Sequence, residues 1–124
     1  MWLKYANNYN SGAAQTWEAA LSGCEWFSYA GYSDWRLPNV RELKSIVDAG
    51  KEYPAINTTY FRDTKIDGYW TSTIYVHGTS HAWFVDFGTG YACGYSKPSF
   101  TTMSVRCAVA REYGSFDNLV IFDF

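Results

Sequence analysis

The chain has 124 residues, the length of one domain, and its composition of 48% hydrophobic and 18% charged residues excludes a disordered protein. Ten Lys and Arg against twelve Asp and Glu give a net charge of −2, which argues against nucleic-acid binding and against attraction to an anionic membrane. Aromatic residues make up 20% of the chain, which suits either a β-rich core or a ring-lined recognition surface.

The sequence shows no segment for membrane insertion or export. No apolar run approaches the ~18 residues that span a bilayer. Met1 is not followed by the apolar stretch of a secretion signal, so an exported protein would carry its signal outside this sequence.

Two helices are predicted in the first half of the chain. The first begins at Thr16, an N-cap residue, and ends at Gly31. Its apolar face has three- and four-residue spacing and comprises Trp17, Ala20, Leu21, Cys24 and Phe27. The second begins at Asn39, which forms a capping box with Glu42, and ends at Gly50. Its apolar face comprises Val40, Leu43, Ile46 and Val47.

The spacing of apolar residues changes from 3.6 to 2 after residue 68. Residues 69–76, 82–87, 91–96 and 104–110 are predicted strands, and residues 116–124 are a candidate edge strand. A three-residue loop over residues 88–90 would pair Phe87 with Tyr91 and Val85 with Cys93, giving a largely aromatic face for the core. A two-residue turn would shift this register. Two helices followed by antiparallel strands predict an α+β fold.

The three cysteines allow one disulfide and one remaining thiol. Cys24 lies on the apolar face of the first helix and Cys107 in the last core strand, so a bond between them would connect the two. It would imply an oxidising compartment. The alternative is that the cysteines are free, buried thiols. Cys93 is expected to be an unpaired core residue.

Metal and hydrolase sites are not indicated. His77 and His81 are four residues apart, but the intervening Gly-Thr-Ser forms a turn and no third ligand lies nearby, whereas zinc needs three or four. No serine lies in a G-x-S-x-G motif. We therefore expect no metal, no cofactor and no catalytic residues.

Several segments resemble a bacterial domain family. Residues 16–48 read TWEAALSGCEWFSYAGYSDWRLPNVRELKSIVD, in which the block GYSDWRLPN is very specific. Further matches are MWLK at residues 1–4, PAINTTYF at 54–61, YWTST at 69–73, AWFVDF at 82–87 and VRC at 105–107. On these motifs the chain resembles the Lcl C-terminal domain family, whose known representative is the C-terminal domain of the Legionella collagen-like adhesin. The resemblance covers residues 1–111 and leaves residues 112–124 as a C-terminal extension.

The resemblance implies a C-type-lectin-like fold, with two helices packed on antiparallel sheet, distantly related to the fold of the formylglycine-generating enzyme. In such folds a helix cysteine commonly bonds to a cysteine of the final strand, which agrees with a Cys24–Cys107 bond. The resemblance also implies an exported, often surface-displayed module, which in the adhesin is a trimer that binds sulfated glycosaminoglycans. Because this chain is net acidic, sulfated glycans are not expected to be its ligand.

The charged residues of the matching motifs are expected to be structural. Asp34 and Arg36 would form an ion pair beside a buried Trp35 and fix the start of the second helix. Arg106 would hold a carboxylate in the core. Leu37-Pro38-Asn39 lacks the acidic residue of a C-type-lectin calcium motif, so no calcium-dependent sugar site is expected.

The function that this reasoning favours is a non-enzymatic, secreted or surface-attached module that binds a glycan or a protein. Rings around the hairpins would make the contacts, and the candidate ligand-binding residues are Tyr75, His77, His81, Tyr91 and Tyr95. One alternative is a structural or trimerising assembly domain of a surface or fibre protein. A weaker alternative is an enzyme of the formylglycine-generating type, which would need a closely spaced reactive cysteine pair.

Overall fold

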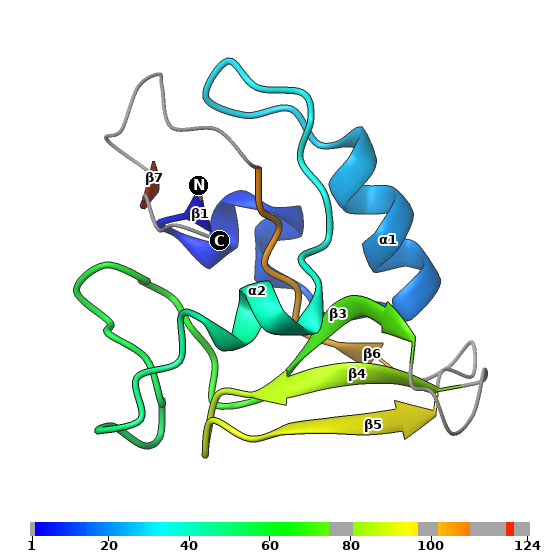
Figure 1. The fold of residues 1–124 in the computed structure, drawn as a ribbon. Helices are drawn as coiled ribbons and strands as arrows, with labels where there is room; N and C mark the ends of the chain where they lie inside the picture. Colours follow the sequence, from blue (N-terminus) through cyan, green and yellow to red (C-terminus); the bar gives the residue numbers. More distant parts are fainter. Residues whose placement is uncertain (1, 75–80, 97–101, 110–118, 121–124) are drawn as a thin grey trace.

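The computed structural model describes residues 2–74, 81–96, 102–109 and 119–120, and within them the fold is α+β, as predicted (Figure 1). Two short 3-10 helices, η1 (Ala6–Asn8) and η2 (Asn10–Gly12), follow the first strand. The two α-helices are α1 (Trp17–Trp26) and α2 (Val40–Lys44). The strands are β1 (Trp2–Leu3), β2 (Gln15–Thr16), β3 (Gly68–Ile74), β4 (His81–Asp86), β5 (Ala92–Ser96), β6 (Thr102–Met103) and β7 (Leu119–Val120).

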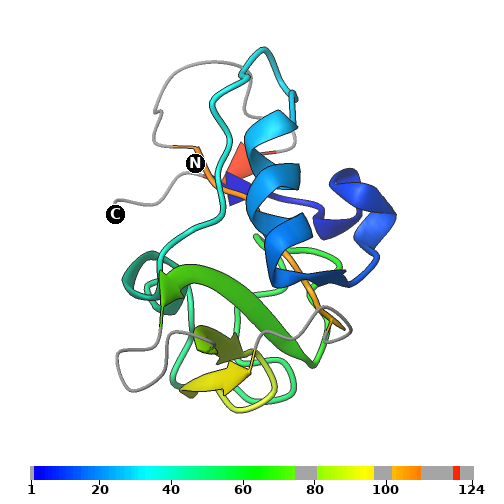
Figure 2. The same cartoon turned by 90° about the vertical axis from the view of Figure 1, so that its right-hand side faces the viewer.

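All strand pairs of the described sheets are antiparallel. The main sheet has the order β3-β4-β5, while β1 pairs with β7 and β2 pairs with β6. The helix α2 packs on β3 and β4, and α1 stands above β3 in the view of Figure 2. Because β7 belongs to the C-terminal extension, its pairing with β1 brings that extension into contact with the N-terminus.

The first helix begins as predicted and ends earlier. The Thr16 hydroxyl accepts a hydrogen bond from the Ala19 N–H at 3.3 Å. The helix ends at Trp26 and not at Gly31, because Phe27 has an extended backbone (φ −74°, ψ 135°). This conformation packs the Phe27 ring edge-on against Trp35, with centroids 5.5 Å apart. Aromatic packing thus overrides the helical spacing in the last turn.

The capping box of α2 is confirmed, but the helix is much shorter than predicted. Asn39 Oδ1 accepts from the Glu42 N–H at 2.8 Å, and Glu42 Oε1 accepts from the Asn39 N–H at 3.0 Å. The helix ends at Lys44, so the prediction that Gly50 ends it is wrong. The Asp48 N–H instead donates to the Ala55 carbonyl at 2.9 Å, because this segment joins a loop. The predicted apolar residue Ile46 is nevertheless buried.

The β4–β5 hairpin differs from its prediction by one residue in register. Val85 pairs with Ala92, and Phe84 pairs with Cys93. The Asp86 N–H donates to the Tyr91 carbonyl at 2.8 Å, so the loop has four residues. The expected aromatic face is therefore not formed, and Cys93 is exposed instead of lying in the core.

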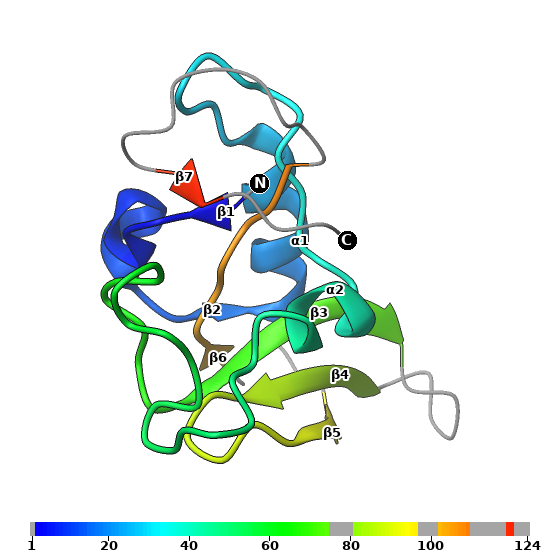
Figure 3. The ribbon, with the colours of Figure 1, turned by 60° about the vertical axis from the view of Figure 1, so that its left-hand side comes forward.

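The segment 102–109 is the centre of the fold, although only β6 and isolated bridges are regular strand structure, in contrast to the strand predicted over 104–110. In Figure 3 it passes between α1 and the N-terminal segment. The Ser104 N–H donates to the Gly68 carbonyl at 3.0 Å, and Ala108 exchanges two hydrogen bonds of 2.9 Å with Arg36. The predicted disulfide Cys24–Cys107 is confirmed, with Cα atoms 5.6 Å apart.

Two adjoining clusters of buried side chains form the core. The first lies between α1 and β3 and contains Trp35 and Trp70, with Trp17 and Phe27 packed against it as predicted. The second lies between α2 and the main sheet and contains Trp2 and Phe87. Most aromatic side chains in the described ranges thus belong to these two clusters or pack against them.

Removing the disulfide should cost a large part of the stability. The bond closes a loop with a sequence separation of 83, which corresponds to about 4.5 kcal/mol in the chain-entropy treatment. We expect Cys24→Ala/Cys107→Ala to lower the free energy of unfolding, measured by urea denaturation, by about 3–5 kcal/mol. Cys93→Ala, at an exposed position, should change it by less than about 0.5 kcal/mol. A loss below ~1 kcal/mol for the double variant would contradict this role.

Candidate functional site

The predicted ligand-binding residues do not form one site in the described part of the chain. Tyr75, His77 and the side chain of Tyr95 lie outside the described residues. His81 begins β4 and pairs with Ser96, whereas Tyr91 is bonded to Asp86 at the other end of this strand. Five residues of strand separate these ends by roughly 16 Å, so His81 and Tyr91 lie at opposite ends of the sheet.

Tyr91 has its own surroundings at the α2 side of the sheet. Its side chain is 70% exposed. The Lys44 ammonium lies 6.0 Å from its ring centroid and donates to the Gly90 carbonyl. Tyr91 is therefore a surface ring beside a cation that already holds the hairpin loop.

Arg36 forms a bidentate ion pair with the carboxylate of Glu42. The two hydrogen bonds measure 2.6 and 2.5 Å. Asp34 is exposed, and Trp35 is buried with its indole N–H donating to the Tyr29 carbonyl at 3.3 Å. The capping-box signal correctly marked Glu42, but nothing in the sequence indicated that this carboxylate also binds Arg36.

The environment of Glu42 favours its charged form. Burial opposes ionisation, but the hydrogen bonds from Arg36 and from the Asn39 N–H, together with the charge of Arg36, lower the pKa of Glu42. The hydrogen bond to Glu42 in turn raises the pKa of Arg36. This pair fixes the start of α2, which is a structural role.

Arg106 is buried and bridges segments that are distant in sequence. Its guanidinium donates to the Leu3 carbonyl at 2.5 Å and to the Thr64 hydroxyl at 2.8 Å, and it lies 5.4 Å from the Phe61 ring centroid. Burial lowers the pKa of Arg106. In these hydrogen bonds Arg106 thus donates to carbonyl and hydroxyl oxygens, which hold β1 and the 61–64 loop against the central segment, while the nearby charge of Asp63 raises the pKa of Arg106 against the effect of burial.

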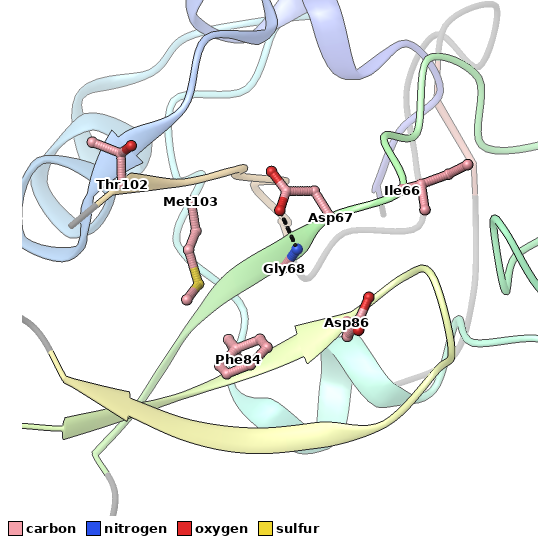
Figure 4. A pocket seen from close by; sticks show the side chains of 7 residues that line it. All are labelled: Ile66, Asp67, Gly68, Phe84, Asp86, Thr102 and Met103. Atoms are coloured by element: carbon pink, nitrogen blue, oxygen red, sulfur yellow. Dashed lines mark hydrogen bonds between the residues drawn. The ribbon is translucent and has the colours of Figure 1, made fainter.

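A surface hollow of about 380 Å³ lies where β3, β4 and β6 meet (Figure 4). Three separate parts of the chain line it, with two carboxylates, a phenyl ring and a thioether among their side chains. The lining residues are Ile66, Asp67, Gly68, Phe84, Asp86, Thr102 and Met103. Strand pairing brings these three segments together. Gly68 of β3 pairs with Asp86 of β4, and Ser104, which follows β6, donates a backbone hydrogen bond to the Gly68 carbonyl.

Glycine at position 68 leaves room for the side chains of Phe84 and Met103 to pack close to the backbone at the floor of the hollow. A Cβ atom there would lie 2.9 Å from Phe84 Cδ2 and 3.2 Å from Met103 Sδ, both too close. Figure 4 shows the Met103 side chain extending from β6 toward Phe84. Any larger residue at this position would displace the two apolar side chains.

Backbone N–H groups orient both carboxylates of the hollow. Asp67 Oδ1 accepts from the Gly68 N–H at 2.8 Å, and Asp86 Oδ1 accepts from the Gly88 N–H at 2.7 Å. Among the described residues, the contact of each second oxygen is a long one of 3.4 Å from a hydroxyl, from Ser104 to Asp67 and from Thr89 to Asp86. Both carboxylates therefore retain acceptor capacity.

Two exposed apolar side chains border the hollow. Tyr53 is 61% exposed and Ile66 is 58% exposed. A Cβ atom on Gly88 would lie 3.3 Å from Ile66 Cγ2 and 3.6 Å from Tyr53 Cδ1, so both side chains lie over this glycine. The Tyr53 N–H donates to the Gly88 carbonyl at 2.8 Å, which fixes the loop of Tyr53 to the hairpin.

This surface combines polar, charged and apolar side chains. It offers hydrogen-bond acceptors, negative charge and apolar contact area. Within the described ranges, no three His, Cys, Asp or Glu side chains are grouped as a metal would require. No direct sequence signal marks the hollow, because its residues come from three segments that only the register brings together.

The sequence comparison identifies the family. A family model for the Lcl C-terminal domain matches residues 1–109 of the chain. The chain belongs to the Lcl C-terminal domain family. No curated protein matches the sequence.

The hollow lies within the Lcl C-terminal domain, and so do all residues of both core clusters. The strand β7 follows the matched region and pairs with β1. Among the described residues of this domain, no helix is long and apolar enough to cross a membrane.

Replacing Glu42 by glutamine isolates the ion pair, since glutamine preserves the capping box. We expect Glu42→Gln to lower the free energy of unfolding at pH 7 by about 1–2 kcal/mol, a value reduced by the partial exposure of Arg36. Because folding lowers the pKa of Glu42, its contribution is present above the unfolded pKa of ~4.3 and is lost as pH falls through the folded value.

The difference between wild type and Glu42→Gln should therefore shrink in urea denaturation series run from pH 7 down to pH 3. Glu25→Gln, at an exposed position of α1, is the matched control and should differ little from wild type at any pH. A difference for Glu42→Gln that stays constant or grows toward low pH would contradict the assignment.

Proposed function

We propose that the chain is a non-enzymatic recognition module of an exported protein, and that it binds a glycan or protein ligand through the hollow between β3, β4 and β6. The family supports a domain of this kind, since its known representative is part of an adhesin. Recognition by shape and surface chemistry needs no catalytic group, and the hollow offers acceptors and apolar surface.

A C-type-lectin-like arrangement is part of this proposal. Two features support it: two helices that pack with antiparallel sheet, and a disulfide between the first helix and the last core segment. An oxidising, extracytoplasmic location is compatible with this bond.

The cysteines support a role in binding over oxidative catalysis. Cys107 is bonded to Cys24, and Cys93 is the one free thiol in the described part of the chain. A formylglycine-generating reaction would need two reactive cysteines close together, whereas Cys107 is buried and already paired.

The observation that carries the proposal is the exposed apolar rim beside an open polar hollow. Tyr53 and Ile66 expose more than half of their side chains at adjacent positions, where they contribute little to the core. Exposed apolar groups that border a hollow with polar side chains are typical of interaction sites.

Removing the rim should abolish ligand binding without unfolding the domain. We expect Tyr53→Ser/Ile66→Ser to lose binding at least tenfold on glycan and extracellular-protein arrays, because the rim supplies apolar contact area. The matched control is Tyr60→Ser/Ile74→Ser, at positions of similar exposure (53% and 51%) outside the hollow, and it should bind like wild type.

Circular dichroism and thermal denaturation of each variant serve as the test that it is folded. If only the control variant Tyr60→Ser/Ile74→Ser loses binding, the ligand binds at another face of the domain, and the hollow is not the site. Wild-type protein that binds neither glycans nor proteins on the arrays would contradict the proposed function.

A further inference from the structure

We propose that the hollow receives a lysine or arginine side chain from a basic segment of a partner protein. This inference rests on the proposed function and names the class of its ligand. It follows from the charge of the hollow, from its apolar floor and from its size.

Among the described residues that line the hollow there are two carboxylates and no cation, so this lining carries negative charge. Asp67 and Asp86 are its charged lining residues. Lys65 precedes the lining in sequence and does not itself line the hollow; its ammonium donates to the Gly12 carbonyl. Two carboxylates with free acceptor capacity attract a guanidinium or an ammonium group and repel sulfate or phosphate.

The floor of the hollow complements the rest of such a side chain. Phe84 offers a ring to the cation, and cations bind over aromatic rings within about 6 Å of the centroid. Met103, whose thioether closes on Gly68, offers an apolar surface for the methylene stem. Lysine and arginine carry both parts, a charged head and an apolar stem.

The size and the rim favour a protein over an extended polysaccharide. A volume of about 380 Å³ lies at the small end of the ~300–1,000 Å³ range of ligand pockets, which suits one long side chain. Tyr53 and Ile66 beside it provide apolar area for the residues that flank that side chain. Aromatic side chains are enriched at protein interfaces, where they serve as anchors.

The test measures binding of fluorescein-labelled octalysine and octaarginine peptides by fluorescence anisotropy. Asp67→Asn/Asp86→Asn removes two charges, while the amide oxygens still accept the Gly68 and Gly88 N–H bonds. We expect this variant to weaken peptide binding at least tenfold.

The matched control is Asp48→Asn/Glu25→Gln, which causes the same change in net charge. Asp48 accepts from the Gly50 N–H at 2.9 Å in the same kind of turn as Asp86, but it does not line the hollow. Peptide binding by this control double variant should change less than twofold. If peptide binding weakens equally in both double variants, the loss of binding follows from the change in net charge alone, and the proposal is overturned.

Thr102→Lys provides a second variant that does not touch the carboxylates. Thr102 is exposed and lines the hollow, so a lysine there should compete with the peptide and weaken binding at least fivefold. Unchanged peptide binding by this variant, or heparin binding that is lost in the hollow variants, would overturn the proposal. If the arrays show a ligand that needs Tyr53 and Ile66 but the peptides do not bind, the cationic ligand fails and the proposed function stands.

Discussion

The structure depends on the bond between Cys24 and Cys107, because this bond fixes a central segment that has little regular structure of its own. Residues 104–109 are buried, and through backbone hydrogen bonds they contact both β3 and Arg36 in the segment that precedes α2. An entropic contribution of about 4.5 kcal/mol is large beside the 5–15 kcal/mol by which domains are usually stable. Arg106 also fixes this segment, since its guanidinium donates a hydrogen bond to the Leu3 carbonyl of β1. The same segment continues into β6, which forms one wall of the hollow.

Features set by local chemistry could be predicted from the sequence. The caps at Thr16 and Asn39 depend on side chains that bond to backbone groups three residues away, so both were found correctly. The pairing of Cys24 with Cys107 was also correct, since the first lies on the apolar face of the first helix, the second lies in a late core segment, and the family resemblance implied the same bond. The family resemblance was confirmed over almost the same residues that carried it.

Features set by packing between distant segments could not be predicted. The spacing of Ile46 marked a buried residue but wrongly extended α2, since burial does not require a helix. A four-residue loop in place of three shifted the β4–β5 register, and because side chains alternate along a strand, the shift moved Cys93 from the expected core to the surface. The hollow was missed for the same reason: Asp67 and Asp86 are nineteen positions apart, and only the β3–β4 register places them together.

The central claim is that ligands bind at the hollow, and the amides that donate to its carboxylates report on it most directly. In a nitrogen–proton correlation spectrum recorded during titration with octalysine, the account predicts that the Gly68 and Gly88 N–H signals shift most, because their acceptors bind the incoming cation. The Gly50 N–H, which donates to Asp48 outside the hollow, should remain unchanged. Shifts at Gly50 as large as those at Gly68 and Gly88, or the largest shifts in residues 75–80, would contradict the account.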